Sequence, residues 1–185
     1  MASSWKKRLI SQSDLMTLHE KLKEKGLKIV FTAGSWDLLH VGQCRYLEKA
    51  KAEGDILVVG VSSNEAIKRV KGPNKPILDE KIRAEMLAYI RPVDFVTILP
   101  EPSCQPTLGL LKPDVFITVR EDWTEEYKQS KEYKTVIKYG GEMQVVDRQS
   151  TSLSTTKIVQ RAIGGQLGDI FKEFVELRKE PLKEK

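Results

Sequence analysis

One stretch of the sequence combines the residue types that phosphate chemistry needs, and it reads IVFTAGSWDLLHVGQCRYL from Ile29 to Leu47. It begins with a short apolar run whose β-branched and aromatic residues are typical of a buried strand. Small residues including Gly34 follow, and from Val41 the apolar spacing is helical. A helix start offers unpaired N–H groups and the positive end of the peptide dipoles to an anion, and His40 lies at this start. The stretch therefore predicts a phosphate site, with a purely structural turn as the competing interpretation.

A second helix opening lies near the other end of the chain. Three consecutive hydroxylic residues, Ser154, Thr155 and Thr156, precede a helical pattern that is predicted to end at Gly164-Gly165. One Ser or Thr is enough to cap a helix, so three exceed what capping requires. This opening therefore also predicts an anion site, and capping alone stays the alternative.

Apolar runs and helical periods alternate between these two openings. Strands are predicted at 29–31, 55–61, 95–99, 114–119 and 142–146, and helices from 11, at 41–53, 63–71, 79–90 and 107–111 and over most of 120–138. In the helix at 79–90, we expect Ile82, Met86, Leu87 and Ile90 to face inward. The alternation predicts an α/β fold, Rossmann-like and doubly wound, with a parallel five-stranded sheet and helices on both faces. Ligands of such folds lie beyond the carboxyl ends of the strands, so the turn after the first strand and the loops at 119–123 and 147–154 are expected to converge.

The composition limits the kinds of partner that the chain can have. With 185 residues we expect one main domain at 28–165, a helical lead-in at 1–27 and a charged helix at 166–185, whose apolar residues would pack on the domain or on a second subunit in a homodimer. A net charge of +5 favours binding of anionic small molecules. The sequence has no motif in which Lys or Arg alternate with aromatic residues, so we do not expect nucleic-acid binding. No segment is apolar enough to span a membrane. Cys44 and Cys104 have no metal-ligand spacing, which favours the reducing cytoplasm.

The residue string from Thr32 to Gln43 resembles the T/N-G-x-F-D-x-x-H-x-G-H signature of nucleotidyltransferases related to the cytidylyltransferases. Trp36 replaces the usual Phe, and Gln43 replaces the second His. Further segments extend the resemblance over 28–163. Residues 154–158 are similar to the S-T-T-x-I element of these enzymes. Similarity to heptose 1-phosphate adenylyltransferases is found at residues 70–77, 83–85, 91–94 and 111–115. Residues 121–123 look like the G-D-D-W of glycerol-phosphate cytidylyltransferases.

The resemblance implies transfer of a nucleotidyl group from ATP or CTP, with Mg²⁺ on the triphosphate and no metal ligand from the protein, to a phosphorylated small molecule. It implies a catalytic set of His40, Gln43 and Lys51. The implied nucleotide-binding residues are Thr32, Ala33, Gly34, Ser35, Trp36, His40, Gly42, Gln43, Arg120, Asp122, Ser154, Thr155 and Thr156. The implied acceptor-binding residues are Asp37, Lys51, Lys71, Arg83 and Trp123. A solvated lysine at position 51 and a surface salt bridge at position 83 are the competing interpretations.

The departure at Gln43 leaves three hypotheses open. A neutral amide hydrogen-bonds a phosphate oxygen about half as strongly as a charged donor. The first hypothesis is an active nucleotidyltransferase, the second a nucleotide-binding protein that has lost catalysis and serves as a regulator or scaffold, and the third a nucleic-acid-binding module. The first leads, because His40, Lys51 and the Ser154–Thr156 element are all present.

Overall fold

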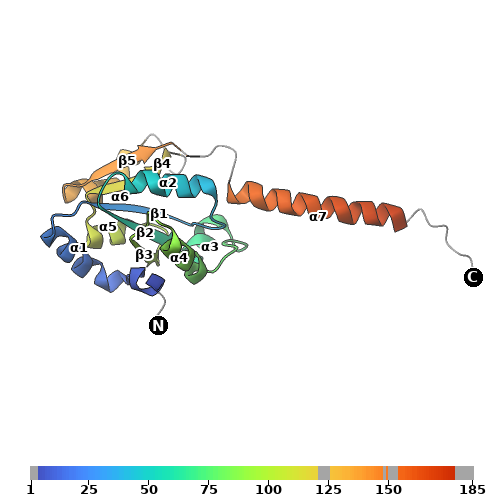
Figure 1. Cartoon of the computed structure of the whole chain (residues 1–185). Helices are drawn as coiled ribbons and strands as arrows, with labels where there is room; N and C mark the ends of the chain where they lie inside the picture. The colour runs from blue at the N-terminus through green and yellow to red at the C-terminus, as the bar shows by residue number, and fades with distance from the viewer. Residues whose placement is uncertain (1–3, 121–125, 148, 150–153, 178–185) are drawn as a thin grey trace, which may run out of the picture. The chain divides into compact units, whose positions relative to one another are not determined.

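The computed structural model describes residues 4–120, 126–147, 149 and 154–177, and its centre is a five-stranded parallel sheet (Figure 1). The strand order is β3-β2-β1-β4-β5. The strands are β1 (Ile29–Gly34), β2 (Ile56–Ser62), β3 (Phe95–Leu99), β4 (Val115–Val119) and β5 (Glu142–Val146). All neighbouring strands pair in parallel, and the interior of β1 is fully buried, as a strand with both faces covered requires. The predicted fold class is therefore confirmed.

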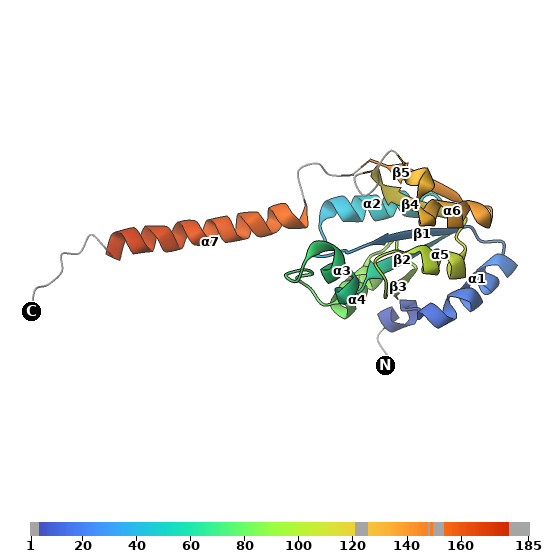
Figure 2. The same ribbon diagram turned by 180° about the vertical axis from the view of Figure 1, so that it is seen from behind.

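Helices cover both faces of the sheet, as the views from the front and from behind show (Figures 1 and 2). On one face, α2 (Val41–Lys51) and α4 (Glu80–Tyr89) contribute Leu47, Ala50, Leu87 and Ala88 to a buried cluster. On the other face, α1 (Leu15–Glu24), α5 (Gln105–Leu111) and α6 (Lys131–Lys138) bury Leu15, Leu108 and Val136. A short helix, α3 (Asn64–Lys71), follows β2. The described residues also include the 3₁₀ turns η1 (Ser4–Arg8), η2 (Gln12–Asp14) and η4 (Tyr127–Gln129).

The predicted inward side of the helix at 79–90 is wrong in detail. Ile82 and Met86 of α4 do not face inward: they are 50% and 38% exposed, and the sheet is instead contacted through Ala84, Leu87 and Ala88. Apolar residues lie on more than one side of α4, so spacing alone does not identify the buried side. In the described part of the predicted helical region 120–138, the 3₁₀ turn η4 precedes α6, which begins at Lys131.

The N-terminal residues pack closely on the sheet. The guanidinium of Arg8 donates to the carbonyls of Ala88 and Val93, each at 3.0 Å, and Leu15 and Leu22 are buried in the core. The chain divides into two compact units, 1–150 and 151–185, so the first unit includes the predicted helical lead-in at 1–27.

The second unit contains one long helix, α7 (Thr155–Leu177). The predicted end at Gly164-Gly165 is wrong, because the helix continues through both glycines and neither has the positive φ of a helix C-cap. A glycine inside a helix costs only about 1 kcal/mol, so the flanking residues can carry the helix past it. In the described ranges, none of the helices has the length and apolar character that crossing a bilayer would demand.

Three aspartates accept hydrogen bonds from backbone N–H groups at the amino-terminal edge of the sheet. The carboxylates of Asp55, Asp94 and Asp114 accept the backbone N–H groups of Lys28, Leu57 and Ile29 at 2.7 to 2.8 Å. Asp114 also pairs with the ammonium of Lys23. Burial by itself raises the pKa of Asp114, but the hydrogen bonds from Lys23 and Ile29 outweigh burial and hold that pKa below its usual value.

We expect Asp114→Asn to lower the free energy of unfolding by about 1–2 kcal/mol at neutral pH, because a charged acceptor of two hydrogen bonds is lost. A carboxyl with a depressed folded-state pKa stabilises the protein above its unfolded pKa of about 3.9 and loses that contribution as pH falls through the folded value. Urea titrations at pH 7 and at about pH 3 should therefore show the gap between wild type and variant narrowing in acid. Glu24→Gln, on an exposed face of α1, is the control and should differ little at either pH. A difference in free energy of unfolding between wild type and Asp114→Asn that stays constant with pH would contradict this account.

Candidate functional site

The candidate site lies where the strand order of the sheet reverses. β1 pairs with β2 on one side and with β4 on the other, so the chain leaves β1 in one direction and later crosses to the opposite side. The carboxyl ends of parallel strands at such a reversal leave a crevice in which ligands of α/β proteins bind. The turn from Gly34 to His40 follows β1 at this edge and leads directly into α2.

Two residues of this turn have a left-handed backbone. Trp36 has φ 53° and Leu38 has φ 48°, a region in which L side chains are uncommon, and such strain persists only where surrounding contacts hold it. The Trp36 side chain supplies one of these contacts: it is buried, and its indole Nε1 donates to the carbonyl of Gly60 on β2 at 2.9 Å. A Cβ at Gly34 would lie 3.1 Å from the indole ring, so glycine lets the turn fold back on itself. The buried indole supports the turn from inside the fold.

Asp37 fixes the turn to the loop that precedes α4. Its carboxylate is 6% exposed and accepts the backbone N–H groups of Ile77 and Leu78 at 2.8 and 3.0 Å. The sequence analysis placed Asp37 among the acceptor-binding residues. These two hydrogen bonds orient the turn and hold the 72–79 loop beside it.

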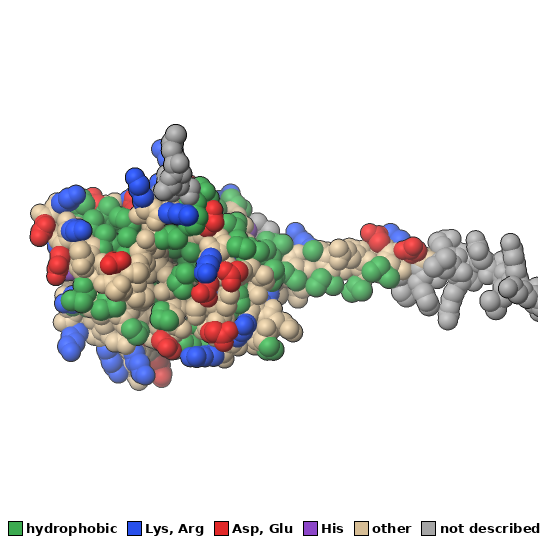
Figure 3. Space-filling model, turned by 90° about the horizontal axis from the view of Figure 1, so that it is seen from below, with side chains coloured by type: hydrophobic (Ala, Val, Ile, Leu, Met, Phe, Trp, Pro, Cys, Tyr) green, Lys and Arg blue, Asp and Glu red, His purple; other side chains and the backbone are tan. Residues whose placement is uncertain are grey.

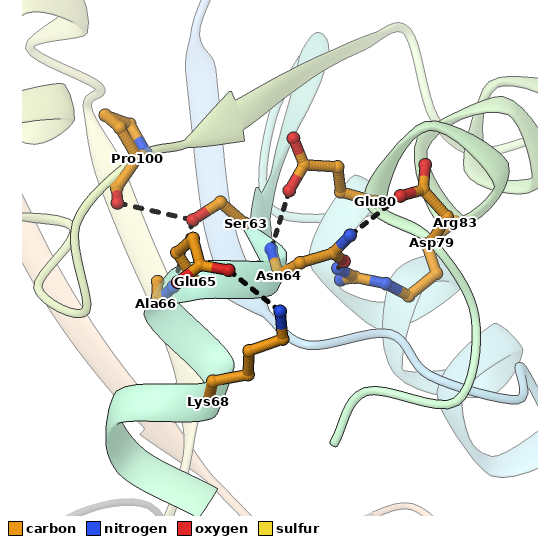
Figure 4. Close-up of polar contacts among 9 residues, drawn as sticks. All are labelled: Ser63, Asn64, Glu65, Ala66, Lys68, Asp79, Glu80, Arg83 and Pro100. Carbon is orange, nitrogen blue, oxygen red and sulfur yellow. Dashed lines mark hydrogen bonds and ion pairs between the residues drawn. The ribbon is translucent and has the colours of Figure 1, made fainter. Parts of the chain in front are cut away.

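Arg83 lies inside the fold and not on its surface, so the surface salt-bridge interpretation is wrong. Its side chain is fully buried, and its guanidinium donates to the carbonyls of Ser35, Ser62 and Leu78 at 2.5, 2.9 and 2.9 Å. It also donates to Oδ1 of Asn64 at 2.9 Å (Figure 4). Burial lowers the pKa of Arg83, and the negative charge of Asp37, Glu80 and Asp79 opposes that decrease. Arg83 therefore holds together the ends of β1 and β2 and the 72–79 loop.

Figure 4 shows that the start of α3 belongs to the same network. The side chain of Asn64 connects Arg83 to Asp79, donating to the Asp79 carboxylate at 2.7 Å. The Asn64 backbone N–H donates to the carboxylate of Glu80 at 2.6 Å, and the Ser63 hydroxyl caps the helix by accepting from the N–H of Ala66. The anion-attracting start of α3 is thus neutralised by a carboxylate of the protein itself.

Lys71 brings a cation to the turn. It ends α3, is exposed, and its ammonium donates to the Ser35 hydroxyl at 2.9 Å. Two residues far apart in the sequence therefore meet at the carboxyl edge of β1. The ammonium of Lys71 therefore lies at the edge of the sheet where the sequence analysis expects a phosphate ligand.

His40 and Gln43 form the opening of α2. His40 is the N-cap residue, with the extended backbone typical of that position. Its backbone N–H donates to Oε1 of Gln43 at 3.1 Å, so Gln43 satisfies one of the groups at the start of the helix, as the third residue of a capping box does. Gly42 is buried in the first turn of the helix. The amide oxygen of Gln43 thus has a structural partner, and the expected contact with a phosphate is left to its NH₂ group.

The side chains of two residues in this strand and turn are committed to the core. The hydroxyl of Thr32 is fully buried, 2.7 Å from the hydroxyl of Tyr46, which in turn donates to the carbonyl of Ile117 at 2.9 Å. The Thr32 side chain is therefore committed to joining β1, α2 and β4. The side chain of Trp36 is likewise committed to the core. Thr32 and Trp36 can therefore contact a nucleotide only through their backbone atoms, and we expect the same of Ala33, whose side chain is a single methyl group.

Lys51 does not lie with His40. Its ammonium contacts the carboxylate of Asp94 at 2.5 Å and the carbonyl of Asp55, and both residues precede strands at the amino-terminal edge of the sheet. The two ends of α2 are separated by about 16 Å, at 1.5 Å per residue. The predicted catalytic and phosphate-binding role of Lys51 is corrected for that reason, and Lys71 is the lysine that the fold brings to the turn.

Other predicted residues are placed only in part. Arg120 follows β4 at the carboxyl edge and pairs with Asp147, which follows β5, at 3.0 Å. Asp122 and Trp123 lie outside the described residues. Ser154 accepts the N–H of Lys157 through its hydroxyl at 3.2 Å and so opens α7 together with Thr155 and Thr156. These three residues belong to the second unit, and their convergence with the turn at 34–40 stays a prediction.

Tyr46 and Asn64 are site residues that the sequence analysis missed. Tyr46 supports the turn from α2 through its bonds to Thr32 and Ile117. Asn64 connects Arg83 to Asp79. A signal for Asn64 existed, because Ser62-Ser63-Asn64 follows a strand and opens a helix just as the residues after β1 do. Nothing in the spacing of Tyr46 distinguishes it from an ordinary core aromatic.

The reversed strand order, the strained turn and the helix opening define a Rossmann-like α/β domain of the nucleotidyltransferase type. The family model described as "Cytidylyltransferase-like" matches residues 31–161. The chain belongs to the cytidylyltransferase-like family, and the family resemblance drawn from the sequence is confirmed.

Relatives and solved structures agree with this assignment. "Bifunctional protein HldE" of Geobacter metallireducens is 41% identical over 148 residues, which are 78% of this chain and 29% of that protein. The protein of the same name from Syntrophotalea carbinolica is 36% identical over 152 residues, or 82% of this chain and 30% of that protein. This chain thus spans about a third of the length of these relatives. A lipopolysaccharide core biosynthesis protein from Thermoplasma volcanium superposes with a TM-score of 0.56 at 28% identity, covering 66% of this chain and 97% of that one. A pantoate-beta-alanine ligase from Francisella tularensis, at 18% identity and a TM-score of 0.50, shares the fold over 96% of this chain and 81% of its own.

Proposed function

We propose that this protein transfers an AMP or CMP group from a nucleoside triphosphate to a phosphorylated small molecule and releases pyrophosphate. The acceptor class that we propose is a sugar 1-phosphate, an alditol phosphate or a phosphonate. The observation that carries the proposal is the strained turn at 34–40, which leads into α2 at the strand reversal and holds Lys71 on Ser35. Family membership and the HldE relatives support the same chemistry.

In this reaction an acceptor phosphate oxygen forms a bond to the α-phosphorus as the bond from that phosphorus to the bridging oxygen breaks. The bridging oxygen keeps the electron pair and leaves with pyrophosphate. Such transfer needs positioning and neutralisation of charge, and little covalent work from the protein. In our proposal His40 donates a hydrogen bond to the triphosphate, the backbone of residues 32–36 holds its α-phosphate side, and Ser154, Thr155 and Thr156 hold its β and γ phosphates.

The residues near the turn suit a metal ion that arrives with the nucleotide. Among the described residues, no three His, Cys, Asp or Glu side chains are grouped so that they could hold a metal ion, and the Asp37 carboxylate already accepts two N–H groups. Mg²⁺ binds readily to phosphate oxygens and water with few protein ligands, and it would neutralise charge on the departing pyrophosphate. Lys71 and the start of α2 would supply the remaining positive charge from the chain itself.

Our proposals for the nucleotide, the acceptor, the compartment and the oligomeric state rest on the family resemblance and on the composition. Similarity of residues 70–77 and 83–85 to heptose 1-phosphate adenylyltransferases favours ATP and a sugar 1-phosphate. We also propose that the protein acts in the cytoplasm as a homodimer. Its two cysteines are both free, which suits a reducing compartment.

A nucleotide-binding protein with weakened catalysis is the second candidate, and Gln43 favours it. The amide oxygen of Gln43 is bonded to the His40 backbone, so at most its neutral NH₂ group can reach a phosphate. Losing one preorganised donor costs about 10²–10³ in rate.

Pyrophosphate release separates the two candidates. The protein should be mixed with Mg²⁺, either ATP or CTP, and each of a sugar 1-phosphate, glycerol 3-phosphate and a phosphonate. Release that requires both the triphosphate and one acceptor would support transfer. Tight triphosphate binding by calorimetry without release for any pair would favour the second candidate, and an absence of triphosphate binding would contradict both.

We expect Gln43→His to preserve or raise turnover. A protonated imidazole at this position carries positive charge toward the phosphates, whereas a neutral imidazole accepts the His40 N–H with one ring nitrogen and leaves the other as a donor. Gln43→Leu, which removes both amide groups at similar volume, is the matched comparison and should lower turnover by about 10-fold or more. Steady-state pyrophosphate release measures both. A complete loss of activity in Gln43→His would mean that the amide makes a contact that an imidazole cannot replace.

A further inference from the structure

The helix α7 presents a stripe of apolar side chains to solvent. Ile163, Leu167 and Ile170 are 50%, 59% and 61% exposed. Figure 3 shows hydrophobic side chains following one another along one side of this helix. A helix of 23 residues with an uncovered apolar stripe gains most of its stability by burying that stripe against a partner.

The spacing of the stripe indicates that the partner is another helix. The three residues are separated by four and then three positions, and apolar residues continue the same alternation at positions 174 and 177. This is the 3.5-residue period of a coiled-coil seam. A membrane surface fits poorly, because helices that lie on anionic lipid have a strongly basic polar face. Residues 155–177 contain three Lys or Arg and three Asp or Glu.

The distribution of these charges identifies which helix fits. The first half of α7 carries Lys157 and Arg161 and no acidic residue, and the second half carries Asp169, Glu173 and one more glutamate, with Lys172 paired to Asp169. A second copy lying antiparallel would place each basic half against an acidic half, whereas a parallel copy would oppose like charges. We propose that α7 pairs with α7 of a second copy as an antiparallel two-helix seam centred near Leu167. Such a pair is isologous and closes on itself as a dimer.

Sedimentation of the full chain tests this pairing and does not depend on the transfer reaction. The wild type should shift from monomer to dimer as its concentration rises, and Leu167→Glu should raise the dissociation constant by at least about 30-fold, because a charge would enter the apolar seam. Ala162→Glu introduces the same side chain on the outer face of the helix and is the matched control; it should alter the constant by less than about 3-fold. A wild type that stays monomeric at about 200 µM, at which even a weak interface would be occupied, would overturn the proposal. So would a dimer that Leu167→Glu leaves intact, because the interface would then lie elsewhere.

Charge reversal tests the antiparallel direction. Reversing the whole basic half with Lys157→Glu and Arg161→Glu should weaken the dimer about 3- to 10-fold, and adding Asp169→Lys and Glu173→Lys in the same chain should restore it, because each helix again opposes unlike halves. Raising the salt concentration should weaken the wild-type dimer. A dimer that strengthens with salt would indicate a parallel pair and overturn the arrangement. Binding of the monomeric chain to anionic vesicles, with no dimer at any concentration, would identify a lipid surface as the partner and would also overturn it.

Discussion

His40→Ala is expected to lower turnover by at least about 10²- to 10³-fold while leaving the fold intact. His40 caps α2 beyond the carboxyl end of β1, where charge on a transferring phosphate would develop. The hydrogen bond from its backbone N–H to the Gln43 side chain would persist in the alanine variant, so the substitution should cost little stability. Single-turnover pyrophosphate release should measure the loss, and the thermal midpoint should report the fold.

The chain supplies a matched control for this substitution, since it contains only two histidines. His19 lies on α1 beside Lys112 and Tyr139, close to the start of β4 at the opposite edge of the sheet from the turn. His19→Ala should leave turnover within about 2-fold of wild type, as expected for a change away from the reacting groups. Near-normal activity in His40→Ala would remove this residue from the proposed mechanism. Equal losses in both variants would point to a general effect on the fold.

The sequence predicted the sheet well because its central parallel strands, buried on both faces, appear as nearly continuous apolar runs, and the short edge strand β5 follows a Gly-Gly turn. β3 and β5 begin and end at the predicted residues, and β1 differs only in continuing to Gly34. Helix orientation was harder to predict. Ile82 and Met86 match an inward period as well as Leu87 does, and only packing against the sheet selects the side with Ala84 and Ala88.

The sequence predicted those parts of the site that one contiguous segment forms. It missed the parts that depend on contacts between distant segments. The strand, the turn and the opening of α2 are contiguous, so their chemistry is visible in one segment. Lys51 and Lys71 look equally suitable in sequence, because the direction in which a helix leaves the site decides between them. α2 begins at the site and carries Lys51 away from it, whereas Lys71 ends α3 with its ammonium on Ser35. Such a choice depends on the path of the chain in space, which residue spacing does not contain.

Arg83 is the residue whose loss should affect stability and activity together. Its guanidinium satisfies acceptors on Ser35, Ser62, Asn64 and Leu78. Arg83→Met would leave these buried acceptors without their donor, and removing one side of a buried charged network typically costs about 3–5 kcal/mol. Turnover should fall as well, because the same bonds hold the strained turn in place. Urea unfolding and pyrophosphate release measure the two effects.

Arg83→Lys keeps the test informative if the methionine variant fails to fold. A lysine retains the charge, but its single ammonium cannot reach the acceptors that the planar guanidinium serves, so we expect a smaller loss of stability and a turnover at least about 10-fold below wild type. Arg69→Met is the matched control: Arg69 is mostly exposed, with one long ion pair to Glu101 at 3.5 Å, and its loss should cost less than about 0.5 kcal/mol. Wild-type stability and activity in Arg83→Lys would mean that charge alone suffices at this position. The turn would then be held by Trp36 and Asp37, which bind it to β2 and to the 72–79 loop without Arg83.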